Sequence, residues 1–128
     1  MSLTNIIALP AEERKPNIRV DLSSFLGDGA GVEFREPRLA DIYPDGALVD
    51  RLRLSFPLIS PDQIATCVLI GKCYIKQPDE NDLDTIRTMC QILDKNPKIY
   101  LRIARRFNDA FMVSYNEIIS SEGNALAE

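Results

Sequence analysis

Residues 32–42 read VEFREPRLADI, and the spacing of the apolar residues changes along them. Apolar and polar residues alternate up to Arg35, which is typical of a strand with one buried face. Pro37 follows, and its restricted φ suits the first turn of a helix. Asp41 then lies where it can interact with Arg38 or with Arg35. The stretch therefore predicts a strand-to-helix switch that fixes how N-terminal strands sit on C-terminal helices.

A second strand is expected on the N-terminal side of this switch. Residues 18–22 (IRVDL) alternate apolar and polar side chains in the same way as residues 32–35. The glycine-rich segment 27–31 (GDGAG) lies between the two runs. Glycine tolerates the positive φ that hairpin turns need. The pattern predicts a β-hairpin within residues 18–36.

Helical patterns occupy the rest of the chain, from residue 37 to residue 119. Ser60, Pro61 and Gln63 combine a helix cap, a proline at the first helical position and a capping box. The helix that follows is apolar on nearly every side, so we expect it to be buried centrally or covered by a partner. The predicted helices cover residues 38–42, 47–54 and 61–75, a stretch that opens at residues 79–82, and residues 97–119.

These elements predict one α+β domain that is predominantly helical. The 128 residues suffice for a single modest core. We expect an N-terminal β-hairpin (18–36) followed by four to five packed helices (37–119), which together form a domain over residues 18–119. Residues 1–17 contain two prolines around a charged run and are expected to form an extended or loosely ordered arm. The small and polar residues 120–128 are expected to form a flexible tail.

The sequence lacks the residues that several catalytic classes need. It contains no histidine, which excludes Ser-His-Asp and Cys-His nucleophile systems and zinc sites of the HExxH type. The three cysteines form no CxxC pair and are too few for a four-cysteine zinc site, so we expect buried packing residues. No carboxylate pair is marked as an acid and base. We therefore expect a chain that is not an enzyme, with no catalytic residue, cofactor or metal.

Two patterns resemble ligand loops without meeting their requirements. A phosphate-binding loop needs a helix after its glycines, whereas a strand is expected after Gly27-x-Gly29-x-Gly31. The acidic run that starts at Asp79 has Asp84 where a calcium-binding EF-hand loop needs glycine. A hairpin turn and helix capping explain these two patterns more simply.

Basic residues cluster only in the last predicted helix, where Lys98, Arg102, Arg105 and Arg106 share one face. Such a face can bind nucleic acid, but it more often docks on acidic groups of a partner or is simply solvated. The net charge of −4 argues against nucleic acid as the partner. A small helical regulator that binds nucleic acid through this face is kept as the alternative function.

Surplus apolar residues suggest surfaces that bind another protein. Methionine and aromatic side chains suit adaptable apolar contacts. The alternative for each of these residues is an ordinary place in the core. Four apolar residues of the last predicted helix lie outside its main apolar stripe and favour a homo-oligomer. They are Tyr100, Leu101, Met112 and Ile119. The candidate partner-binding residues are Phe56, Leu58, Ile59, Phe107, Phe111, Met112 and Tyr115.

The switch segment also resembles a motif of known proteins. It is similar to the point at which tail assembly chaperones of long-tailed bacteriophages leave their N-terminal strands. There an apolar residue, a basic residue, Glu and Pro are followed, four residues after the Pro, by Asp and an apolar residue. This chain has Arg38-Leu39-Ala40 where the family more commonly has Thr-x-Gly. The matching residues are Phe34, Arg35, Glu36, Pro37, Asp41 and Ile42.

The resemblance implies a non-enzymatic assembly factor, in a family of small, acidic proteins with an N-terminal β element and a helical remainder. Such a chaperone would bind the tape measure protein and keep it soluble during tail assembly, with the tail tube protein as a further candidate partner. It would act in the cytoplasm of the bacterial host and be absent from the mature virion. A longer form is often made by ribosomal frameshifting in this family. A cytoplasmic location also agrees with the lack of a signal-peptide pattern or a membrane-spanning apolar run.

Overall fold

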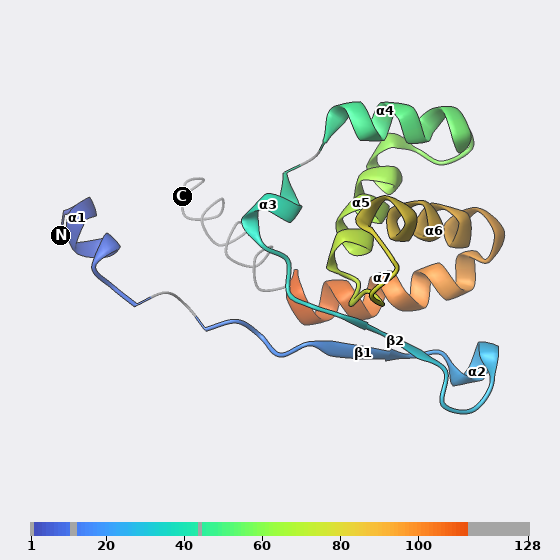
Figure 1. The fold of residues 1–128 in the computed structure, drawn as a ribbon, viewed down its shortest axis with the longest axis horizontal. Coiled ribbons are helices and arrows are strands. Elements are labelled where there is room, and N and C mark those ends of the chain that lie inside the picture. The colour runs from blue at the N-terminus through green and yellow to red at the C-terminus, as the bar shows by residue number, and fades with distance from the viewer. Residues whose placement is uncertain (1, 11–12, 44, 113–128) are drawn as a thin grey trace, which may run out of the picture.

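The computed structural model describes residues 2–10, 13–43 and 45–112 (Figure 1). The chain has an α+β fold that is mostly helical, in which an N-terminal antiparallel hairpin precedes the main helices, as predicted. Five helices are described after residue 37. The elements are α1 (Leu3–Ile7), β1 (Ile18–Asp21), α2 (Ser23–Leu26), β2 (Gly31–Phe34), α3 (Leu39–Ile42), α4 (Gly46–Ser55), α5 (Pro61–Cys73), α6 (Asp82–Lys95) and α7 (Pro97–Phe111).

The two strands pair in a register that turns one face toward the helices. Ile18 lies opposite Phe34, and Val20 lies opposite Val32. Val20 and Phe34 are almost fully buried, whereas Arg19, between Ile18 and Val20, is exposed. This alternation agrees with the strand pattern in the sequence, because neighbouring side chains of a strand point to opposite faces.

The connection between the strands is longer than a tight turn. After β1, the Asp21 carboxylate accepts a hydrogen bond of 2.9 Å from the N–H of Ser23, the first residue of the single-turn helix α2. Gly27 and Gly29 then take positive φ values of 101° and 81°. The glycines occupy turn positions, as predicted, but the helical turn before them was not predicted. Its four residues are too few to produce a helical period in the sequence.

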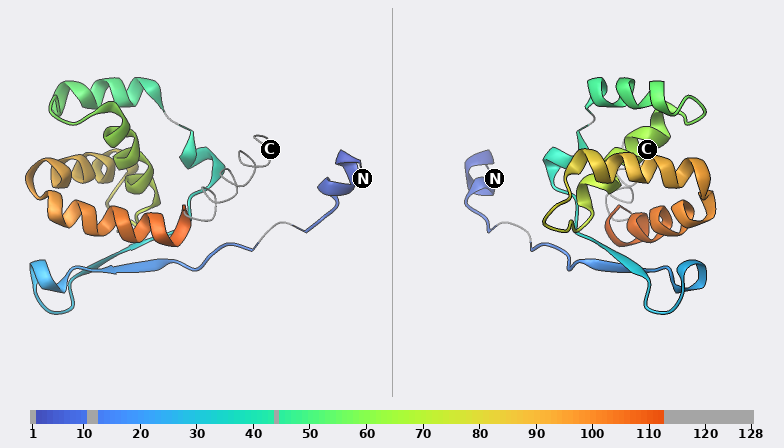
Figure 2. Two further views of the ribbon diagram at one scale, coloured as in Figure 1. Left: turned by 180° about the vertical axis from the view of Figure 1, so that it is seen from behind. Right: turned by 45° about the vertical axis from the view of Figure 1, so that its right-hand side comes forward.

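Helix α5 lies at the centre of the helical part and packs against α3, α4 and α6. Its central burial confirms one of the two alternatives that the sequence left open. The predicted cap is present, since the Ser60 hydroxyl accepts from the Gln63 N–H at 3.2 Å. In Figure 2, the hairpin runs along one side of α7, and β1 contacts that helix. The hairpin therefore covers the side of α7 on which it lies.

Close packing of α5 on α6 depends on Gly71. A Cβ atom at Gly71 would lie 2.7 Å from the Ile86 Cα, which is too close for two carbon atoms. The Thr85 hydroxyl donates a hydrogen bond of 2.8 Å to the Gly71 carbonyl across the same contact. The two backbones approach so closely because one of them carries no side chain at this point.

An aromatic cluster joins the hairpin to the helices. The Phe34 and Phe107 rings lie edge to face with centroids 5.9 Å apart, and Phe107 and Phe111 are 5.3 Å apart. The Phe34 ring also meets the Tyr74 ring edge to face at 5.9 Å. Edge-to-face geometry is the arrangement that aromatic rings prefer. The cluster ties β2, the end of α5 and α7 into one core.

All three cysteines are free and buried, as predicted. Cys73 lies in an apolar environment, and burial raises the pKa of its thiol to about 12. A hydrogen bond with Cys90, together with burial, raises the pKa of the Cys67 thiol. The three side chains serve as small apolar packing groups.

Candidate functional site

The strand-to-helix switch is held by a paired arginine and aspartate. The Arg35 Nη1 donates to the Asp41 Oδ2 at 2.7 Å, and its Nη2 donates to the Asp41 Oδ1 at 3.3 Å. The two side chains are only 24% and 12% exposed. A bidentate, partly buried ion pair of this kind is stronger and more directional than an exposed ion pair. Asp41 was expected to meet Arg35 or Arg38, and it meets both.

Asp41 also starts helix α3. Its carboxylate accepts a hydrogen bond of 2.7 Å from the backbone N–H of Arg38, the residue at the N-cap. The hydrogen bond from Arg35 is the main cause that lowers the pKa of Asp41, and the Arg38 N–H contributes in the same direction against the opposing effect of burial. Asp41 therefore stays ionised and satisfies both a guanidinium and an otherwise unpaired helix N–H group.

Arg35 connects the switch to the end of helix α5. Its Nη2 donates to the Lys72 carbonyl at 3.1 Å, and its backbone N–H donates to the Cys73 carbonyl at 2.9 Å. The Ile75 N–H donates to the Glu33 carbonyl at 2.9 Å on the other side. A cation is favourable near these carbonyls because the C-terminus of a helix carries partial negative charge. The hairpin is thus attached to α5 through the switch.

The other residues of the motif have separate positions. Phe34 is in the core, and Pro37 is half-buried between the strand and α3. The Glu36 carboxylate accepts a hydrogen bond from the Lys15 backbone N–H, which fixes the last part of the N-terminal arm. Ile42 is 40% exposed and faces a surface hollow. The six residues therefore form one connected unit without forming a pocket of their own.

The surface hollows on the described part of the chain include three that bear on the predicted residues. The first, which we call the α3–α5 hollow, has a volume of about 180 Å³ and is mainly apolar. The second, the elbow hollow, has a volume of about 620 Å³ at the turn between α4 and α5. The third, the basic hollow, has a volume of about 300 Å³ beside α7.

The three hollows differ in the charge of the residues that line them. The α3–α5 hollow is lined by Asp41, Ile42, Tyr43, Val49, Ala65, Thr66, Val68 and Leu69. The elbow hollow is lined by Asp50, Arg53, Leu54, Pro57, Leu58, Ile59, Ser60 and Pro61. The basic hollow is lined by Phe25, Lys98, Leu101, Arg102 and Arg105.

The apolar connector before α5 divides between core and surface. Leu58 is 91% exposed, and Leu54, which lines the same elbow hollow, is 85% exposed. Phe56 is half-buried against the core. Ile59 is buried, which corrects its assignment as a partner-binding residue. The Ile59 N–H bonds to the Phe56 carbonyl at 3.1 Å, and this turn points Leu58 outward.

The partner-binding assignments on the last helix, α7, are corrected in the same way. Phe107 and Phe111 were candidates for binding a partner, but both are buried in the aromatic cluster. Tyr100, which was expected to favour self-association, is buried as well. These side chains lie inside because α6 packs against α7 on one side and the hairpin on another. Met112 is half-buried, and Leu101 is exposed.

Two further residues of those predictions, Tyr115 and Ile119, lie outside the described residues.

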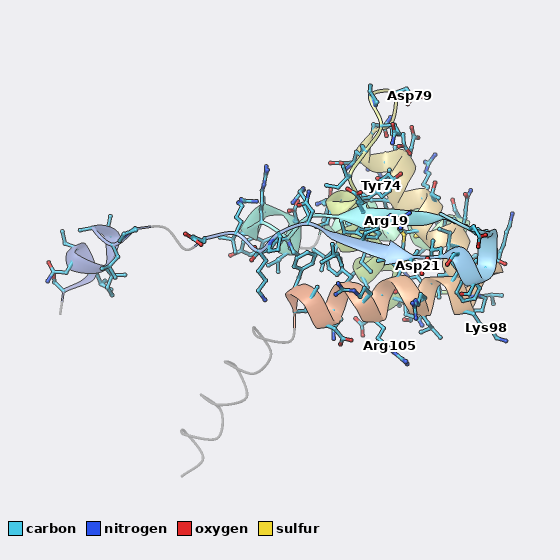
Figure 3. The ribbon with its side chains drawn as sticks, turned by 90° about the horizontal axis from the view of Figure 1, so that it is seen from below. Arg19, Asp21, Tyr74, Asp79, Lys98 and Arg105 are labelled. Carbon is cyan, nitrogen blue, oxygen red and sulfur yellow. The ribbon has the colours of Figure 1, made fainter. Side chains whose placement is uncertain are left out.

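The four basic residues of α7 are all exposed, as a shared solvent-facing side requires. In Figure 3, Lys98 lies near α2 and Arg105 lies farther along α7. Phe25 of α2 joins Lys98, Arg102 and Arg105 in the basic hollow, which the sequence did not predict because Phe25 is remote in the chain. Hydrogen bonds from Ser23 lower the pKa of the neighbouring Asp21, and Arg102 adds a smaller effect.

The described residues contain neither a metal-binding cluster nor a helix that could span a membrane. Within residues 2–10, 13–43 and 45–112, no three histidine, cysteine or acidic side chains come together in a way that could hold a metal ion. Over the same ranges, no helix combines the length and the apolar character needed to cross a membrane.

Comparison with known proteins finds no matching family model, no matching curated protein and no matching solved structure.

Proposed function

We propose that this chain is a non-enzymatic tail assembly chaperone of a long-tailed bacteriophage. The observation that carries the proposal is the connected unit of residues 34–42. Six of its residues match the family pattern, and the pair Arg35–Asp41 joins the strand, α3 and the end of α5. A motif that organises three elements has a physical reason to recur in a family. The client would be the tape measure protein, with the tail tube protein as a further partner.

The elbow hollow is the surface that suits such a client best. Leu54 and Leu58 line it and are almost fully exposed to solvent. An amphipathic helix of the client can lay its apolar face against such a surface. Burial of one leucine contributes about 1.5–3 kcal/mol before the costs of association. Coverage of the client's apolar faces would keep it soluble until tube subunits polymerise around it.

The place of action follows from the same proposal. A chaperone of this kind would work in the cytoplasm of the bacterial host and leave before the virion is complete. The chain would then be present with the tape measure protein in infected cells and absent from purified particles.

Co-expression with the tape measure protein of the same phage tests the proposal. The soluble fraction of the client should rise when the chain is present, and the two should purify together. The double variant Leu54→Glu/Leu58→Glu should lose this effect, because charges would replace the exposed apolar contacts. Leu26→Glu is the matched control, since Leu26 is also exposed but lies on α2. A client whose solubility does not change with the wild-type chain would contradict the proposal.

A second candidate function is nucleic-acid binding through the basic hollow. The supporting observation is that an exposed aromatic ring, Phe25, accompanies three cations there. Cations neutralise phosphates, and an aromatic ring can stack on an unpaired base. The net charge of −4 opposes the approach of a polyanion over the rest of the surface.

Retention on a nucleic-acid column distinguishes the second candidate from the first. If the basic hollow binds nucleic acid, retention should fall steeply with salt and disappear in the triple variant Arg102→Ala/Arg105→Ala/Arg106→Ala. The same variant should still keep the tape measure protein soluble if the elbow hollow is the client surface. Retention that survives the triple variant would rule out this face as the binding site.

A further inference from the structure

The basic hollow combines three cations with two apolar side chains. Lys98, Arg102 and Arg105 lie four and three residues apart on α7, so they follow one side of the helix over about 10 Å. Phe25 and Leu101 line the same hollow and are 43% and 56% exposed. A ligand that matches this hollow therefore carries anionic groups around an apolar one.

The chain itself presents a segment of that chemistry, residues 79–84 (DENDLD), which we call the acidic segment. It has four acidic residues and no basic one, and no other six-residue stretch of the sequence has as many acids. Leu83 lies within it and is 40% exposed. The acidic segment thus has anions around an apolar side chain, where the basic hollow has cations around two.

Pairing within the chain shows which charges remain for a partner. The Lys76 Nζ lies 2.7 Å from the Asp82 Oδ1, so Asp82 is already partnered. Asp79 and Asp84, one on either side of Leu83 in the sequence, are exposed. In the basic hollow, Arg102 has Asp21 nearby. The charges best placed for a partner are therefore Asp79 and Asp84 on one surface, and Lys98 and Arg105 on the other.

The acidic segment and the basic hollow face away from each other. Figure 3 shows Asp79 on the opposite side of the helical body from Lys98 and Arg105. The segment leads into the first turn of α6, and the packing of α6 against α5 and α7 fixes its place. The hollow lies on α7, which belongs to the same packed body. The two surfaces therefore cannot meet within one chain, whereas two copies can bring them together.

We propose that the acidic segment of one copy docks in the basic hollow of the next, so that the chain associates with itself head to tail. Leu83 packs against Leu101 and Phe25, and the carboxylates around Leu83 approach the cations of α7. Two different surfaces meet in this contact, so copies add one after another into a ring or an open chain. Salt screens exposed ion pairs, and the association is therefore strongest at low salt.

The apolar part of the hollow favours this occupant over nucleic acid. Leu101 is more exposed than Phe25, and an aliphatic side chain offers an unpaired base no ring to stack on. Leu101 gains instead from burial against another aliphatic side chain. The net charge of −4 opposes nucleic acid more than a second copy, because nucleic acid carries a charge at every phosphate. The proposal does not depend on the client of the chaperone.

Charge reversal on either surface tests the docking. Asp79→Lys/Asp84→Lys reverses the acidic segment, and Lys98→Glu/Arg105→Glu reverses the basic hollow. In sedimentation velocity at low salt, the wild-type chain should associate as its concentration rises. Each double variant alone should associate at least about tenfold more weakly, because like charges then face each other.

A mixture of the two double variants supplies the rescue. The intact hollow of one variant meets the intact acidic segment of the other, and the reversed surfaces are complementary as well, so association should return. A single chain with all four reversals should also associate with itself. Asp50→Lys/Asp62→Lys is the matched control, since it changes the net charge as much as reversal of the acidic segment does. Asp62, like Asp84, lies in the first turn of a helix, and this control should associate as the wild type does.

Disulfide trapping tests the same contact without changing any charge. Leu83→Cys mixed with Leu101→Cys under mild oxidation should give a cross-linked dimer that contains one copy of each. The three native thiols are buried and should not compete. Leu83→Cys mixed with Leu58→Cys is the matched control, because Leu58 is exposed at the elbow hollow. This control pair should cross-link at the background level.

Several outcomes would overturn the proposal. One is a wild-type chain that stays monomeric at every concentration, and another is a mixture of the two double variants that does not associate. Association that is lost on reversal of the hollow but kept on reversal of the acidic segment would mean that another ligand fills the hollow. Association that disappears after nuclease treatment would assign the hollow to nucleic acid. Equal cross-linking of position 83 to positions 101 and 58 would mean that the contact is not specific.

Discussion

Arg35 and Asp41 show how two side chains can hold several elements in place. Together they make two hydrogen bonds to each other, one to the end of α5 and one to the start of α3. The sequence indicated that Asp41 meets Arg35 or Arg38, because a strand that turns into a helix brings these residues close. The further contact of Arg35 with the Lys72 carbonyl could not be predicted, since the two residues are distant in the sequence.

Replacing Asp41 should lower stability more than replacing an exposed aspartate. Asp41→Ala leaves Arg35 partly buried without its partner and removes the contact that starts α3. We expect a loss of about 2 kcal/mol in the free energy of unfolding, since hydrogen bonds to charged groups contribute about 1.5–3 kcal/mol each. Urea denaturation measures this loss. Asp50→Ala, an exposed change on α4, is the control and should have little effect.

The stabilisation from Asp41 should also depend on pH. The pKa of Asp41 is lowered in the folded chain from its ordinary value of 3.8, chiefly by the hydrogen bond from Arg35. Its contribution is therefore fully present above about pH 4 and is lost as the pH falls through the lower folded value. The stability difference between the wild type and Asp41→Asn should be constant from pH 7 to pH 5 and shrink below pH 4. A difference that grows as the pH falls would contradict the assigned pair.

At the scale of elements, local signals in the sequence located most helices, and long-range packing set their positions. Ser60 with Gln63 marks the start of α5, and Asn81 and Pro97 mark the starts of α6 and α7. Two short helices were not predicted: α2 in the hairpin connection, and α1 within the arm that was expected to be extended or loosely ordered. Helices of four or five residues carry too little periodicity to be recognised.

The contact between α5 and α6 predicts an unusual response to alanine. Alanine normally favours a helix over glycine by about 1 kcal/mol. Gly71→Ala should nevertheless destabilise the chain by about 1–3 kcal/mol, because its Cβ would meet the backbone of Ile86 at 2.7 Å. Thermal unfolding measures the change. Gly46→Ala is the matched control at the start of α4, where the added Cβ would meet no atom within 4 Å apart from its chain neighbours and its own helix backbone, and no loss is expected.

At the scale of the whole molecule, the hairpin and the helices share one core. Val20 and Phe34 from the strands are buried in the same cluster as Ile64 of α5 and Phe107 of α7. The hairpin therefore belongs to the helical body, and the switch segment fixes its place. The N-terminal part of the arm, with α1 at its end, keeps its apolar residues outside this core.

The buried cysteines should report the opening of this core. Cys67, Cys73 and Cys90 are fully buried, and the pKa of Cys73 is raised to about 12, so little thiolate is accessible at pH 8. We expect no alkylation of the native chain over minutes and three alkylated thiols in urea, as measured by mass spectrometry. Fast alkylation of one thiol under native conditions would mean that its helix opens locally.

The sequence by itself determined the fold class, the hairpin, most helix starts and the burial of the cysteines. These features depend on local pattern: alternation along a strand, helix caps, and the apolar helical stretches in which the cysteines lie. Only the tertiary structure decided which apolar residues stay on the surface. Helical spacing identifies an apolar face but not what covers it, so the sequence left Phe107 and Phe111 open between the core and a partner surface. The packing of the hairpin along α7 places both in the core. Leu58 is exposed and its neighbour Ile59 is buried because both lie in a backbone turn. A turn has no periodic pattern from which the exposure of its residues could be predicted.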